Sequence, residues 1–171
     1  MMKRENLSRG PARHAGLRAA LLLLLASLLV SSASAQTAEF RADYTVEVAS
    51  TSAHLFHVTT DLKNVEGPAV ELSLPTWTPG WYTVENYAKN VLRFKVTDAG
   101  GRALPHRMTR KQTWRVETNG ARDVRVEFDY SANVLALNQA KVTSDYAFFT
   151  GTQLFLEPVG RRASPSTCRV A

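Results

Sequence analysis

Three histidines outside the first 35 residues are the side chains best suited to bind a metal ion or to transfer a proton. They are His54, His57 and His106. On an extended strand His54 and His57 point to opposite faces, because they are three residues apart, so a shared metal ion is not expected. His106 has no thiol or carboxylate close by in the sequence. We therefore expect all three histidines to be satisfied by local hydrogen bonds or to face solvent.

The sequence contains no motif that predicts a nucleophile, a zinc site or a phosphate-binding loop. His-Glu-x-x-His, Gly-x-Ser-x-Gly and a glycine-rich phosphate loop are all missing. Glu127 and Asp129 share a predicted strand face with arginines, which is typical of a solvated surface. No residue of this chain is therefore predicted to be catalytic.

An aromatic and proline-rich corner at residues 74–82, Leu-Pro-Thr-Trp-Thr-Pro-Gly-Trp-Tyr, is the strongest candidate for recognition. Its prolines fix their own φ angles and Gly80 permits a sharp turn, so Trp77 and Trp81 should stand on a rigid support. The indoles either close one end of the core or form a wall for a ligand or a neighbouring domain. The residues by themselves favour closure of the core, which is the commoner use of large aromatic side chains.

Hydrophobic alternation with a period of two predicts that β-strands position this corner. The alternating segments are 40–48, 53–63, 70–74, 91–98, 114–116, 124–130 and 146–158. In the segment 91–98, Leu92, Phe94 and Val96 fall on one face. A short helical turn is expected only within 84–90. The predicted fold class is all-β, an antiparallel β-sandwich or saddle-like sheet with at most one helical turn.

Two turns are expected to close hairpins, one at 98–101 and one at 118–120. A two-residue loop in the second would pair Trp114 with Arg125 on the core face. A three-residue loop pairs Trp114 with Val124 instead, and places two apolar side chains together. We therefore predict the three-residue loop.

The first 35 residues have the composition of an export signal. Basic residues precede an apolar run from Ala19 to Val30, and Ala33 and Ala35 fit the small-residue rule for cleavage. The run is 12 residues long, which is too short to span a bilayer. We expect residues 1–35 to be a signal peptide cleaved near Ala35, with a periplasmic or extracellular product and no stable membrane anchor.

The net charge of +6 is concentrated at the two ends of the chain. Residues 1–35 hold five basic residues and one acidic residue, and residues 161–171 hold three arginines, so residues 36–160 are close to neutral. Such a domain has no electrostatic footprint for nucleic acid or an anionic membrane. Cys168 is the only cysteine, which excludes an internal disulfide. We expect one β domain at 36–160 and a disordered tail at 161–171.

Several segments, in order, resemble a known family. These are the corner at 74–82, Tyr-Ala-Lys-Asn-Val at 87–91, residues 98–105, residues 111–116 and residues 148–155. Together they are similar to the N-terminal domain of the secreted glycyl aminopeptidases of peptidase family M61, over about Tyr44 to Gly160. In that family the β domain precedes a zinc catalytic domain that carries His-Glu-x-x-His.

The resemblance implies contact with that catalytic domain or with the rim of its substrate cleft. The residues to which it assigns this contact are Trp77, Pro79, Gly80, Trp81, Tyr82, Thr150, Gly151 and Thr152. Family members often carry Asn where this chain has Thr150.

The chain stops where the catalytic domain would begin, and the residues after Gly160 do not resemble the family's continuation. Zinc is therefore expected only in the absent domain, and the chain should not hydrolyse peptides by itself. Its expected partners are the catalytic metallopeptidase domain and, through it, a peptide substrate. The alternative is a stand-alone periplasmic β-sandwich module in which Trp77 and Trp81 hold a peptide or a carbohydrate.

Overall fold

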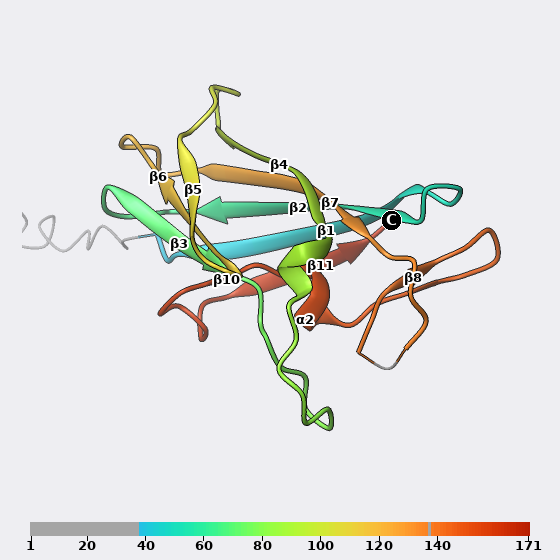
Figure 1. Cartoon of the computed structure of the whole chain (residues 1–171). Coiled ribbons are helices and arrows are strands. Elements are labelled where there is room, and N and C mark those ends of the chain that lie inside the picture. Colours follow the sequence, from blue (N-terminus) through green and yellow to red (C-terminus); the bar gives the residue numbers. More distant parts are fainter. Residues whose placement is uncertain (1–37, 137) are drawn as a thin grey trace, which may run out of the picture. The chain divides into compact units, whose positions relative to one another are not determined.

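The computed structural model describes residues 38–136 and 138–171, which fold mainly into β-strands (Figure 1). In chain order the elements are β1 (Arg41–Ser50), β2 (Leu55–Lys63), β3 (Ala69–Ser73), η2 (Tyr87–Asn90), β4 (Val91–Asp98), β5 (His106–Arg110), β6 (Thr113–Glu117), β7 (Val124–Ser131), β8 (Lys141–Val142), β9 (Ala147–Phe148), α2 (Gly151–Leu154), β10 (Glu157–Pro158) and β11 (Ser166–Val170). The expected signal peptide lies outside the described residues. In the described part of the chain, no helix has the length and apolar character that crossing a membrane requires.

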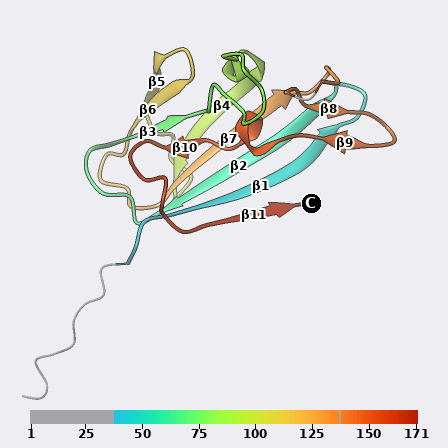
Figure 2. The same ribbon diagram turned by 90° about the horizontal axis from the view of Figure 1, so that it is seen from below.

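Two sheets contain most of these strands. The larger has the order β11-β1-β2-β7-β4 and the smaller the order β10-β3-β6-β5, while β8 and β9 pair with each other. All of these pairs are antiparallel except that of β1 with β11, which run side by side in the same direction (Figure 2). The all-β class is therefore confirmed, and the larger sheet is mixed rather than purely antiparallel.

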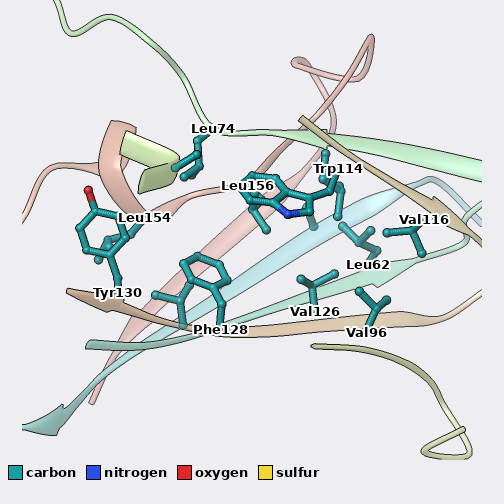
Figure 3. Packing of buried hydrophobic residues seen from close by; sticks show 14 of the residues in the cluster. Leu62, Leu74, Val96, Trp114, Val116, Val126, Phe128, Tyr130, Leu154 and Leu156 are labelled. Carbon is teal, nitrogen blue, oxygen red and sulfur yellow. The ribbon is translucent and has the colours of Figure 1, made fainter. Parts of the chain in front are cut away.

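The core lies between the two sheets, which pack as a sandwich (Figure 3). In β2 every second side chain is buried, among them Phe56, Val58 and Leu62. Trp114 of β6 stacks on Phe94 of β4 with ring centroids 4.8 Å apart, which joins the smaller sheet to the larger. Alternation along each strand thus records which face is covered by the opposite sheet.

The turn at 118–120 does not close a hairpin, so that prediction is wrong. β6 belongs to the smaller sheet and β7 to the larger, and Trp114 and Val124 are therefore not paired. The backbone turns over Asn119 and Gly120, whose φ angles are 50° and 83°. Two strands that face each other from opposite sheets show the same alternation of inward-facing apolar residues as two strands paired in one sheet. The alternation therefore cannot distinguish the two arrangements.

A bulge in β4 reverses the face that was expected for Leu92. The register with β7 shifts between Leu92 and Lys95, and Arg93 within the bulge has a φ of 53°. The extra residue turns Leu92 to the outer face, where it is 42% exposed, whereas Phe94 and Val96 still face the core.

The end of the chain differs most from the expected structure. The segment 146–158 is divided into β9, α2 and β10, because the side chain of Gln153 reaches back to the backbone N–H of Thr150 at 2.9 Å and starts a helical turn. The expected turn within 84–90 is present as η2. Residues 161–171 are not a disordered tail, since β11 adds to the free edge of β1. All five side chains of β11 are exposed, so its pairing leaves no hydrophobic pattern in the sequence.

Candidate functional site

The corner that follows β3 is closed by backbone hydrogen bonds. It leaves the sheets as a long green loop before the chain returns through η2 (Figure 1). The N–H of Trp81 donates to the carbonyl of Thr78 at 3.0 Å, and the N–H of Glu85 donates to that of Thr76 at 2.8 Å. Gly80 between them has a φ of 85°, which explains why the turn requires glycine.

The aromatic side chains of the corner differ in their exposure. Trp77 is 47% exposed and Tyr82 is 93% exposed, while Trp81 is half-buried. Pro79 and Gly80 are exposed as well. The predicted closure of the core is therefore wrong for Trp77, whose indole is accessible for contact.

Glu85 ties the corner to the connection that follows β7. Its Oε1 accepts a hydrogen bond from Nε1 of Trp81 at 3.0 Å and another from Nδ2 of Asn138. Asn138 is only 4% exposed, so the carboxylate satisfies an amide in the interior. A charged acceptor shared by two donors holds both segments in place. Sequence reasoning missed Glu85 and Asn138, which belong to no motif.

The two segments singled out from the sequence meet in the fold. Oγ1 of Thr78 lies 2.8 Å from Oγ1 of Thr152 and 3.0 Å from Oη of Tyr87, and Oγ1 of Thr152 lies 2.9 Å from that of Thr150. A chain of hydroxyl groups thus joins the corner, η2 and the start of α2, with Gly151 inside that turn. Within the described residues, no hydrogen bond links Trp77 or any other predicted aromatic residue of the corner to residues 150–152.

Gln153 is a further polar residue of this region that sequence reasoning missed. It is fully buried, its Oε1 accepts the backbone N–H of Thr150, and its Nε2 has no partner within the described residues. A buried donor without a partner costs about 1–3 kcal/mol. The spacing of threonine and glutamine, three residues apart, is that of a capping box and could have identified the turn.

The histidines are satisfied locally, as predicted. Nδ1 of His57 lies 2.7 Å from Oδ1 of Asp129, and Arg93 pairs with the other oxygen of that carboxylate. Burial by itself would raise the pKa of Asp129, but the hydrogen bonds and charges of His57 and Arg93 hold the pKa below its ordinary value. Nδ1 of His54 and Nδ1 of His106 each contact a backbone carbonyl oxygen. Across 38–136 and 138–171, no group of three or more His, Cys, Asp or Glu residues is placed to hold a metal ion.

Comparisons with known proteins agree with this architecture. The chain matches the family described as Peptidase M61 N-terminal domain over residues 43–171. It is also similar to a solved aminopeptidase N family protein from Idiomarina loihiensis, with 24% identity and a TM-score of 0.71, and that likeness shows the fold. The similarity covers 76% of this chain but only 22% of that protein. No curated protein matches. The family match extends to residue 171, so the expectation that the resemblance ends at Gly160 is wrong.

Proposed function

Because the chain belongs to the peptidase M61 N-terminal domain family, we propose that it is the non-catalytic β domain of an exported, glycyl aminopeptidase-like zinc metallopeptidase. In this role it supports the catalytic domain and the rim of the substrate cleft. In this proposal the zinc ion belongs to the catalytic domain, as the family resemblance implies. The aminopeptidase N family protein that shares the fold supports this assignment at the level of architecture.

Exposed apolar side chains on the corner and on the segments linked to it by hydrogen bonds are the observation that carries the proposal. We call them the corner surface, and they are Trp77, Tyr82, Val84, Val134, Leu135, Tyr146 and Phe148, with exposures between 39% and 93%. Hydrogen bonds join the segments that bear them, from Asn138 to Glu85 and from the N–H of Val142 to the carbonyl of Ala132. A group of exposed aromatic and branched side chains is typical of a surface that packs against another domain.

Hydrogen bonds within the chain hold the corner without a contribution from any partner. The hydroxyl chain through Thr78 and Thr152 and the carboxylate of Glu85 fix the corner from two sides. Preorganised segments lose less conformational entropy on association than mobile loops do. A corner held in this way favours a role in docking, because docking requires the exposed indole of Trp77 to keep a fixed orientation.

Complex formation with the separately expressed zinc catalytic domain of an M61 family member tests the proposal. The full 171-residue chain should bind it, and the double variant Trp77→Ser, Tyr82→Ser should bind at least about tenfold more weakly. The matched control is the double variant Leu92→Ser, Met108→Ser, which removes two apolar side chains outside the corner surface that are 42% and 51% exposed. It should bind the catalytic domain as the wild type does. Equal weakening in both variants, or no complex in gel filtration and calorimetry, would overturn the docking role.

Two further measurements address the rest of the proposal. Expressed with residues 1–35, the chain should appear in the exported fraction with a new N-terminus near Gln36, which N-terminal sequencing detects. The purified chain should not hydrolyse glycyl substrates even when zinc is added. Hydrolysis at a rate that scales with the purified chain would refute the non-catalytic assignment.

A further inference from the structure

A cleft lies next to the base of the corner, since Pro75 and Thr152 are among the residues that line it. It has a volume of about 380 Å³ and is lined by residues of β1, α2, β10 and the loop that leads to β11. Its apolar floor consists of Phe40, Tyr44, Pro75, Phe155 and Pro158. Both the volume and the aromatic lining lie in the range of small-ligand sites.

The aromatic walls of the cleft are fixed by their neighbours. Oη of Tyr44 donates to the carbonyl oxygen of Leu156 at 2.8 Å, and the Tyr44 ring lies 4.9 Å from that of Phe155. Burial, with carboxylates nearby, raises the pKa of Tyr44 to about 12, so the hydroxyl stays a donor. A Cβ atom on Gly151 would lie 3.0 Å from the Phe155 ring, so this glycine allows the ring its position.

The rim of the cleft carries one uncompensated positive charge. The guanidinium of Arg161 lies over the Phe40 ring, 4.5 Å from its centroid, and makes no ion pair within the described residues. Its neighbour Arg162 is neutralised by Glu157, with nitrogen–oxygen distances of 3.0 and 3.3 Å. An anion entering the cleft would therefore meet an available guanidinium, while the one carboxylate of the lining is already paired.

Hydroxyl groups complete the polar side of the cleft, those of Ser164 and Ser166 together with that of Thr152. Ser164 and Ser166 line it, and neither side chain makes a hydrogen bond within the described part of the chain. A guanidinium with hydroxyl donors next to an aromatic floor matches a carboxylate attached to an apolar group.

We propose that this cleft binds an apolar carboxylate, with an aromatic or branched group on the floor and the carboxylate at Arg161. This chemistry has two sources, a free aromatic acid and the C-terminal residue of a peptide. The cleft contains none of the exposed apolar residues of the corner surface, although Pro75 of the corner and Thr152, which hydrogen-bonds to Thr78, line it. Variants at Trp77 and Tyr82 therefore test the docking role, and variants at Arg161 test the cleft.

Three probes titrated into the ¹⁵N-labelled 171-residue chain test the proposal. N-acetyl-phenylalanine and 3-phenylpropanoate carry the carboxylate, and N-acetyl-phenylalanine amide lacks it. We expect saturable shifts of the Thr152, Ser164 and Ser166 amide signals with N-acetyl-phenylalanine, and none with the amide. Binding of both acids assigns aromatic acids in general, and binding of N-acetyl-phenylalanine alone assigns the peptide C-terminus. No saturable shift with either acid, or equal shifts with the amide, would overturn the proposal.

Variants at the rim separate the charge of Arg161 from its packing. Arg161→Gln should weaken the binding of N-acetyl-phenylalanine at least about fivefold, and Arg161→Lys should retain part of the affinity because it keeps the charge. The matched control Arg107→Gln, an exposed arginine on β5, should bind as the wild type does. Unchanged affinity in Arg161→Gln, with an otherwise unchanged amide spectrum, would contradict the assigned contact.

Discussion

Replacing Glu85 with alanine should destabilise the chain by removing an acceptor that two segments share. The amide of Asn138, which is 4% exposed, would lose the partner of its Nδ2 in the interior. An orphaned buried donor costs about 1–3 kcal/mol. The indole N–H of Trp81 is half-buried and can turn partly to water, so its loss adds less. We therefore expect the free energy of unfolding to fall by about 2–3 kcal/mol.

Urea denaturation followed by far-ultraviolet circular dichroism measures this loss. The matched variant Glu85→Gln keeps an oxygen at the same reach and gives up only the charge, so it should lose about 1 kcal/mol or less. Hydrogen exchange at the backbone N–H of Trp81, which donates to Thr78, should quicken in the alanine variant and much less in the glutamine variant. Losses that agree within about 0.5 kcal/mol between the two variants would refute the argument that a shared acceptor holds the corner.

Three other predictions concern the core and the outer face. Because the pKa of Asp129 is lowered in the folded state, its stabilising contribution is present above the unfolded-state pKa and is lost as pH falls through the folded-state pKa. The destabilisation caused by Arg93→Gln should therefore become smaller towards acid pH. Urea titrations between pH 6 and pH 3 measure this change. A destabilisation that is independent of pH would contradict the ion pair. Gly151→Ala should lower the free energy of unfolding by about 1 kcal/mol in thermal denaturation, because Phe155 is held between other rings and cannot move away from a new Cβ. A variant more stable than the wild type would show that the Phe155 ring can move. Leu156→Ala should lower the free energy of unfolding by about 2–5 kcal/mol, since this side chain is fully buried. A loss below about 1 kcal/mol would contradict its place in the core.

Much of the strand content could be predicted, because burial on one face leaves a local record. The alternation of Phe56, Val58 and Leu62 in β2 is an example. The turn of the corner also follows from residue types, since Gly80 takes the positive φ that such a turn requires. β11 left no such record, because its contacts with β1 are made by backbone groups that every residue carries.

The candidate site was only partly accessible to the same reasoning. The Thr150–Thr152 segment was selected by resemblance, but its hydrogen bond to Thr78 joins residues 74 positions apart. Glu85 and Asn138 are 53 positions apart and carry no pattern that pairs them. Their roles depend on which loops meet at one end of the sandwich.

The sequence by itself determined that this chain is a β protein with an aromatic corner that turns at a glycine, and that it has no motif for catalysis. Only the tertiary structure decided that β6 and β7 lie in opposite sheets, that Trp77 faces solvent, and that a cleft opens beside Arg161. The physical reason is that a two-residue period specifies only whether a side chain is covered. Which segment covers it is set by long-range packing and backbone pairing, and no short stretch of sequence contains that information.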